Sequence, residues 1–331
     1  MNISNLKDIL RDEPKYRLKQ AKQAVFLDLI EDWDDNSTLP KNIRETLKEE
    51  CPLMIDASEL VSKSRDVIKA VITLSDGNKI ETVLMRHKGS HNTVCVSTQV
   101  GCKLGCKFCA TGQAGFKRDL TVNEILEQVI YFARYLKKYD SRISNIVFMG
   151  MGEPFLNYDN TLSAIKRLNS KEDFNIGARK MSISTSGIVP GINRLADENL
   201  QINLAISLHG PNDKLRSKLM PINSKYSIER ILSAVDDYIL KTNRKVMFEY
   251  LLIKDVNDSR NCADQLAEIM KKPLYMVNII RYNHTDTNFK PSPRETVDKF
   301  KRILEKKGIN ITERREFGQD IKAACGQLSG K

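Results

Sequence analysis

The chain carries the run CKLGCKFC at residues 102–109, a C-x3-C-x2-C pattern that places three thiols within eight residues. Three thiols cannot all pair with one another as disulfides, because one is always left over. A structural zinc site needs four ligands, and no fourth Cys or His lies close by in the sequence. Iron–sulfur clusters are held by cysteine thiolates, usually four, so three would leave one iron open to a non-protein ligand. The run therefore predicts an open cluster that binds and reduces a small molecule, with zinc or chance spacing as alternatives.

Composition indicates a large globular protein. The 331 residues are 41% hydrophobic and 29% charged, which is enough for one large domain with a smaller one attached. No run of 18 or more apolar residues is present, so we expect no membrane span. The polar N-terminus lacks the apolar stretch of a signal peptide. Seven cysteines, three of them clustered, are typical of cytoplasmic metal and redox chemistry and not of a secreted disulfide framework.

Charge is distributed unevenly along the chain, whose formal net charge is +11. Residues 1–60 hold 9 Lys and Arg against 13 Asp and Glu, a net of −4, whereas the remainder holds 44 against 29, a net of +15. A basic body favours a polyanionic partner such as RNA or DNA. The alternative is a basic surface that serves only solubility.

Residues 1–60 are predicted to form a helical accessory domain that contacts RNA. Helices are expected at 6–11, 17–33 and 41–51. Its small core is expected to contain Tyr16, Phe26, Leu27, Leu29, Ile30 and Trp33. Residues 61–92 are predicted to form a β-hairpin connection, because two β-rich runs at 66–74 and 79–85 flank an Asp-Gly turn signal.

From residue 93 onward the sequence alternates between strand-like and helix-like segments. Strands are expected at 93–97, 145–149, 180–185, 202–207, 245–252 and 276–281, with a last β-like run at 310–315. Helices are expected at 122–138, 159–168, 192–199, 228–241, 263–271 and 294–307. Six β/α units with short apolar strands predict an α/β fold, in which a parallel sheet over residues 93–315 curls into a partial or complete barrel. Residues 316–331 follow as a tail.

Unusual polar residues follow the predicted strands, where a barrel of this kind gathers its functional groups. The glycines at 150 and 152 could suggest a dinucleotide-binding loop. The third glycine of such a loop is missing and Pro154 interrupts the turn, so we reject this interpretation. The alternative to a functional role for this stretch is a plain turn that the Glu153 side chain caps. Hydroxyl and amide side chains at the other strand ends are well placed to contact a ribose or a carboxylate, and a lone histidine there is more often structural.

The tail contains the stretch GQDIKAACGQL at residues 318–328. A cysteine among small residues near a chain terminus is a poor core residue. Cys325 is therefore a candidate for a mobile nucleophile, and an inert exposed thiol is the alternative.

Together these motifs resemble the radical S-adenosylmethionine (SAM) enzymes, and within them the RlmN/Cfr family of RNA adenine methyltransferases. The resemblance is carried by CVSTQVGC at 95–102, CATG at 109–112, Gly-Glu-Pro at 152–154 and the tail, and it covers about residues 65–328. It implies a (β/α)6 partial TIM barrel with a [4Fe-4S] cluster on Cys102, Cys106 and Cys109. It implies that SAM binds at Gly152, Glu153, Ser184, Ser207, Leu208, His209 and Asn283.

The resemblance also implies that two SAM molecules are used in turn. The first would methylate Cys325, and the second, cleaved reductively at the cluster, would give a 5′-deoxyadenosyl radical that takes hydrogen from the S-methyl group. The methylene radical would add to the adenine, Glu81 would accept the ring proton, and Cys95 would release the product by forming a disulfide with Cys325. This order suits the chemistry, because adenine C2 is electrophilic whereas a thiolate readily attacks a sulfonium methyl. Cys51 and Cys262 match no family position and are expected to serve packing.

Two reaction sites occur in this family. The RlmN type methylates C2 of an adenosine in the peptidyl-transferase region of 23S rRNA, and often the adenosine 3′ of the tRNA anticodon. The Cfr type methylates C8 of the same rRNA base and confers antibiotic resistance. Pro154 favours C2, because Cfr has alanine there. The resemblance further implies an electron donor such as flavodoxin. A monomer is the default expectation, and cysteine usage favours the cytoplasm. A zinc-containing RNA-binding protein without catalysis is the alternative from a different class.

Overall fold

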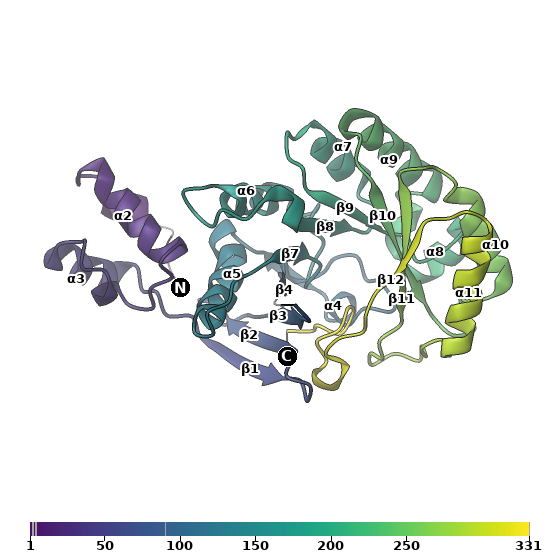
Figure 1. Cartoon of the computed structure of the whole chain (residues 1–331), viewed down its shortest axis with the longest axis horizontal. Coiled ribbons are helices and arrows are strands. Elements are labelled where there is room, and N and C mark those ends of the chain that lie inside the picture. The colour runs from purple at the N-terminus through teal and green to yellow at the C-terminus, as the bar shows by residue number, and fades with distance from the viewer. Residues whose placement is uncertain (2, 4, 90, 331) are drawn as a thin grey trace.

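The structure, a computed structural model, describes Met1, Ile3 and residues 5–89 and 91–330. A ten-stranded sheet forms its centre, with the order β1-β2-β3-β4-β7-β8-β9-β10-β11-β12 (Figure 1). The strands from β4 to β12 are parallel to their neighbours, and β1 to β3 extend one edge in antiparallel fashion. β1 and β12 lie at opposite ends of this order, so the curled sheet is a partial barrel.

The predicted β/α units are confirmed, with ends that differ by a few residues. The parallel strands are β4 (His91–Cys95), β7 (Asn145–Phe148), β8 (Met181–Thr185), β9 (Asn203–Ser207), β10 (Val246–Leu252), β11 (Tyr275–Arg281) and β12 (Ile311–Glu313). The main helices between them are α5 (Val122–Lys137), α6 (Tyr158–Asn169), α7 (Val189–Asp197), α9 (Ile228–Thr242), α10 (Arg260–Ile269) and α11 (Arg294–Lys306). None of the helices in the described residues has the length and apolar composition of a membrane-spanning segment.

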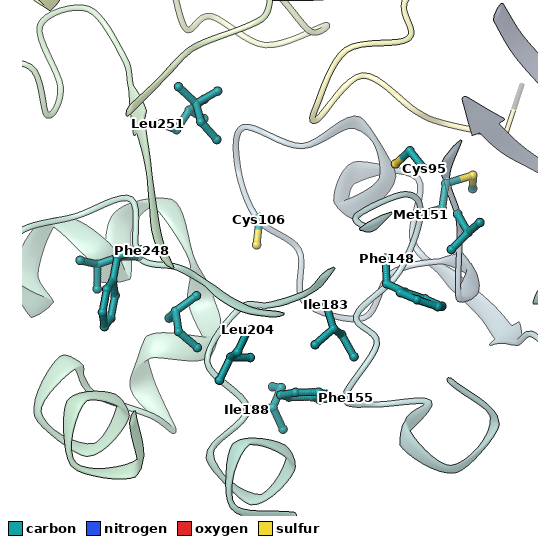
Figure 2. Packing of buried hydrophobic residues seen from close by; sticks show 14 of the residues in the cluster. Cys95, Cys106, Phe148, Met151, Phe155, Ile183, Ile188, Leu204, Phe248 and Leu251 are labelled. Carbon is teal, nitrogen blue, oxygen red and sulfur yellow. The ribbon is translucent and has the colours of Figure 1, made fainter. Parts of the chain in front are cut away.

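Alternation along the strands separates an apolar outer layer from a more polar interior. Ile183 and Leu204, on neighbouring strands, belong to the large hydrophobic cluster (Figure 2). On β10, Phe248 packs against Tyr275 with ring centroids 4.7 Å apart and the rings tilted by 49°. The next residue, Glu249, lies on the opposite face and lines the cavity inside the barrel. Period-two alternation therefore positions polar groups inside a barrel whose walls are hydrophobic.

The predicted hairpin is continuous with the barrel sheet. β2 (Val67–Thr73) and β3 (Lys79–His87) pair in antiparallel fashion, and β3 then pairs with β4. β1 (Ala57–Val61), which the sequence did not predict, pairs with β2 and spans the expected boundary at residue 60. The division into domains stays a prediction. The structure adds that the hairpin forms an edge of the main sheet.

The N-terminal helices α1 (Leu6–Ile9), α2 (Lys15–Phe26) and α3 (Lys41–Glu50) form a second hydrophobic cluster, to which α5 contributes Ile130. The guanidinium of Arg134, also on α5, donates hydrogen bonds to the carbonyls of Leu53, at 2.8 Å, and Ile30. Both contacts are buried. Arg134 therefore links the helical segment to the barrel.

The sequence-based core of this segment was partly wrong. α2 ends at Phe26 and does not continue to residue 33, because the chain turns at Leu29, whose φ is +55°. Trp33 instead lies in a short 3-10 turn and is buried as expected. Two of the expected core residues, Tyr16 and Leu27, lie on the surface, 54% and 44% exposed.

Replacing Arg134 with Met should loosen residues 17–53 from α5. Two buried carbonyls would lose their charged donor, at a cost of about 1–3 kcal/mol each. Hydrogen exchange measured by mass spectrometry should show faster exchange in residues 17–53 and unchanged exchange in β8 to β11. Lys137→Met is the matched control, because Lys137 contacts the carbonyl of Asp28 on the exposed side of the same helix. Equal exchange in the two variants would contradict this role of Arg134.

Candidate active site

A cavity lies at the carboxyl ends of the parallel strands, which is where such barrels place their functional groups. The cysteine loop, the strand ends and the C-terminal tail enclose it. Its lining includes these residues predicted from the sequence: Cys95, Cys102, Cys106, Cys109, Gly152, Glu153, Ser184, Ser207, His209, Asn283 and Cys325. Leu208 lies instead in the core, and Glu81 is buried at the end of β3 that the tail covers.

A two-stranded stem fixes the cysteine loop. β5 (Gln99–Gly101) pairs with β6 (Phe116–Asp119), and the Cys102 amide donates to the Gly115 carbonyl at 2.8 Å. Gly101 has a φ of +77°, and a Cβ there would lie 1.9 Å from the Gly115 oxygen, so only glycine fits. The sequence did not predict this stem, because each strand is short.

The three cysteines of the loop are close together and largely buried. Burial raises the pKa of Cys102 to about 12 and that of Cys106 well above its usual range, and neighbouring thiols add to both shifts. Burial also raises the pKa of Cys109. In the chain without metal these groups are therefore neutral thiols. Because the thiolate is the metal ligand, cluster binding must displace their protons.

The arrangement of these thiols fits a polynuclear cluster. Among the described residues, no group of three or more His, Cys, Asp or Glu converges on a point that could hold a single metal ion. In a [4Fe-4S] cluster each cysteine ligates its own iron, so the sulfurs surround the cluster without meeting at one point. Three thiols that line one cavity match that requirement, whereas a closed zinc site requires four converging ligands.

The turn after β7 is held tightly against the base of the cysteine loop. Gly152 has a φ of +100°, and a Cβ there would lie 2.6 Å from the Cβ of Gln99. The Glu153 carboxylate accepts hydrogen bonds from the amides of Phe155, at 3.1 Å, and Ser186, at 2.7 Å. Burial raises the pKa of Glu153. In the structure this carboxylate thus joins the ends of β7 and β8.

His209 follows β9 in a left-handed conformation, with a φ of +54°. Its Nδ1 accepts a hydrogen bond from the Leu251 amide at 3.1 Å, so this nitrogen is unprotonated. Burial, together with the nearby Arg216 guanidinium, lowers the pKa of His209 to about 3. Its ring makes an edge contact with Phe108 of the cysteine loop, with centroids 4.9 Å apart. His209 therefore positions two segments of the cavity wall as a neutral ring.

The tail folds back over the cavity and is hydrogen-bonded to the cysteine loop (Figure 1). The Ala110 amide donates to the Gly326 carbonyl at 2.7 Å, and the Thr111 hydroxyl donates to the Leu328 carbonyl at 2.6 Å. Asn283, at the end of β11, donates from Nδ2 to the Cys325 carbonyl at 3.1 Å. The structure therefore brings Cys325 into the cavity that Cys95 and the three loop cysteines line.

Cys95 and Cys325 face a cation that the sequence analysis did not select. Burial raises the pKa of Cys95 to about 12, and the nearby Cys325 adds to this shift. The pKa of Arg314 is raised, chiefly by Cys325 and further by Glu249 and Cys95. Arg314 directly follows the last strand, and its place at a strand end was the signal that could have identified it.

Glu249 is a second residue that the sequence analysis missed. Its Oε2 accepts a hydrogen bond from Asn278 Nδ2 at 2.8 Å, whereas its buried Oε1 has no partner within the described part of the chain. A buried carboxylate oxygen is costly to leave unsatisfied. A hydroxyl or amine donor on a bound molecule would satisfy it, so the cavity fits a ligand such as SAM. An acid within the apolar run VMFEYLL was the available signal.

Acidification should destabilise the protein through His209. Its folded-state pKa lies below the unfolded value of about 6.5, so its contribution is present above pH 6.5 and is lost as the pH falls toward 3. Between pH 7.5 and 5.5, wild type should lose about 1.4 kcal/mol more unfolding free energy than His209→Gln. Urea unfolding of both proteins at both pH values measures this difference. Equal losses would show that His209 is not held neutral.

Comparisons with known proteins identify the family of this chain. The model of the Radical SAM superfamily matches residues 96–265. The protein named "Probable dual-specificity RNA methyltransferase RlmN" of Staphylococcus saprophyticus is 45% identical over 321 residues, which cover 96% of this chain and 88% of that protein. The "Ribosomal RNA large subunit methyltransferase N" of Nitrosopumilus maritimus is also 45% identical, over 95% of this chain and 92% of that protein.

The fold of the chain also matches that of a solved structure. The crystal structure of a radical SAM methyltransferase from Sphaerobacter thermophilus superimposes with a TM-score of 0.95 at 42% identity, and the match covers 100% of this chain and 98% of that one. Similarity to methyltransferases over nearly the whole length rules out the alternative of a zinc protein without catalysis. The chain is an enzyme that belongs to the radical SAM superfamily and, within it, to the RlmN family of RNA methyltransferases.

Proposed function

We propose that this enzyme methylates C2 of an adenosine in the peptidyl-transferase region of 23S rRNA, and the adenosine 3′ of the tRNA anticodon, through a methylated Cys325. The main support is the position of Cys325 in one cavity with Cys95 and the three loop cysteines. The "dual-specificity" in the name of many relatives supports two RNA substrates. Pro154 favours C2 over the C8 of Cfr-type enzymes.

The loop thiols would hold the [4Fe-4S] cluster, and the residues at the strand ends would hold SAM. When bound, these two groups supply the radical that removes hydrogen from a methyl group. Within the proposed SAM site, Gly152 and Glu153 shape the turn after β7, and Ser184 and Ser207 offer hydroxyls at the ends of β8 and β9. Leu208, His209 and Asn283 complete the set proposed from the sequence, Leu208 through its backbone because its side chain lies in the core.

Cys325 is the proposed methyl acceptor, and its surroundings suit a nucleophile. A thiolate attacks the sulfonium methyl by polar displacement, which forms the new sulfur–carbon bond as the old one breaks. The Arg314 guanidinium lines the same cavity as Cys325 and Cys95, so its positive charge lies near both sulfur atoms. Cys95 is the proposed resolving thiol. Its thiolate would attack the sulfur of Cys325, the bond between that sulfur and the methylene carbon would break, and the released carbon would take up a proton to give the methyl group. The Cys95–Cys325 disulfide that forms would then be reduced by cellular thiols.

Glu81 is the proposed acceptor of the ring proton. In the structure its carboxylate is paired with Lys69 and accepts the amide of Ser329. We further propose a cytoplasmic location, on the grounds of cysteine usage and an RNA substrate. A monomer is the default assembly, and a flavodoxin-like protein is the electron donor that the family resemblance suggests.

Nucleoside mass spectrometry on cells that lack and then regain this gene tests the proposed function. The account predicts 2-methyladenosine in 23S rRNA and in tRNA only when the gene is present. Synthetic 2-methyladenosine and 8-methyladenosine serve as chromatographic standards. Appearance of 8-methyladenosine in rRNA would show the Cfr-type reaction instead.

The two catalytic cysteines should give different phenotypes. Cys325→Ala should abolish methyl transfer and retain the cluster, since no acceptor remains. Cys95→Ala should accumulate enzyme covalently joined to RNA, since addition proceeds without release. Denaturing gels with labelled RNA detect the adduct, and Cys262→Ala is the matched control because Cys262 lies on α10, away from the cavity lining. Normal turnover by Cys95→Ala without an adduct would remove its proposed role.

A further inference from the structure

A buried ion pair lies under the C-terminal tail. Lys69 of β2 and Glu81 of β3 are joined at 3.1 Å between Nζ and Oε1, with side chains 6% and 1% exposed. Lys69 is directly opposite Val83 in the hairpin, and Glu81 lies two residues before Val83 on the same strand. All three therefore lie on one face of the hairpin. Because Val83 lines the cavity, this face is the one turned toward the active site.

Both members of the pair are hydrogen-bonded to the tail. Lys69 Nζ donates to the carbonyl of Lys322 at 3.3 Å, three residues before Cys325. Glu81 Oε2 accepts from the amide of Ser329 at 2.9 Å, four residues after Cys325. The pair thus contacts the loop of Cys325 on both sides, through backbone groups that do not depend on the side chains of the tail.

The opposite charges of Lys69 and Glu81 explain why both side chains form hydrogen bonds to the tail. A buried carboxylate is stable only when it is paired and its remaining lone pairs accept hydrogen bonds. Lys69 supplies the opposite charge to Oε1, and Ser329 supplies a donor to Oε2. If the tail leaves, Glu81 loses the donor to Oε2 and Lys69 loses an acceptor. Tail docking and the geometry of the ion pair are therefore coupled.

We propose that Lys69 is a positioning residue, which acts with Glu81 as a clamp that keeps the Cys325 loop docked over the cavity. The clamp follows from contacts of the chain itself and explains how a terminal segment keeps one position. Its link to methyl transfer rests on the proposed function. There, the clamp would hold the carboxylate of Glu81, the proposed proton acceptor, and the Cys325 loop in a fixed relation to each other.

The test measures how fast Cys325 is alkylated in the anaerobically purified protein with its cluster. N-ethylmaleimide is added, and peptide mass spectrometry follows Cys325, with Cys262 as an internal reference. Lys69→Met should speed alkylation of Cys325 about tenfold or more, because a charged hydrogen bond to the tail is lost. Alkylation of Cys262 should not change. Lys79→Met, at an exposed lysine of the same hairpin, should behave as wild type.

A second pair of variants tests the clamp without removing either buried charge. Ser329→Pro removes the amide donor to Glu81, whereas Ser329→Ala keeps it. Only the proline variant should expose Cys325. Equal rates for these two variants would overturn the proposal, as would a rise in Lys69→Met that Cys262 shares. The readout needs no RNA, so the clamp can fail while C2 methylation stands, or hold while the RNA product proves to be different.

Discussion

Two hydrogen bonds between the chain's last residues and its cysteine loop determine how the active site is built. The Ala110 amide donates to Gly326, and the Thr111 hydroxyl donates to Leu328. These bonds join the segment that carries Cys325 to the segment that carries the three loop thiols. Neither segment could form the site alone, because the loop lacks Cys325, the proposed nucleophile, and the tail lacks a rigid support. The barrel provides the fixed strand ends against which both segments are held.

The charged and titratable side chains of this cavity are arranged for a binding site and not for the most stable fold. The buried carboxylate oxygen of Glu249 has no partner in the described residues and costs stability, whereas the buried thiols and the neutral histidine cost stability only at pH values that would charge them. Arg314 and Arg216 lie beside these groups, and the Arg216 guanidinium also donates to the Ser186 carbonyl at 2.6 Å. Groups arranged in this way suit a site that is completed by a cluster and a charged cofactor.

Local patterns in the sequence were sufficient for the barrel. Short apolar strands alternate with amphipathic helices, so their order and approximate ends could be read from periodicity. The end of α2 could not, because Leu29 turns the chain without a glycine or proline to mark the turn. The stem of β5 and β6 was missed because each strand is too short to show alternation.

Residue types indicated the chemistry of the site, but contacts distant in sequence determine its geometry. The cysteine spacing predicted the cluster loop, and small residues around Cys325 marked a mobile thiol. No local pattern could show that Asn283 contacts the Cys325 carbonyl, that Lys69 pairs with Glu81, or that Arg314 faces both non-cluster cysteines. These contacts depend on the return of the tail to the barrel mouth, which only the folded chain reveals.

The central claim is that the methyl group passes through Cys325 before it reaches RNA. Its most direct test is a single-turnover experiment with SAM labelled in the methyl carbon, followed by peptide mass spectrometry of the tail and nucleoside analysis of the RNA. The account predicts label on Cys325 first and in the adenine ring only afterward, with the label on protein declining as the label on RNA rises. Labelled adenine that forms while Cys325 stays unmodified throughout would contradict it.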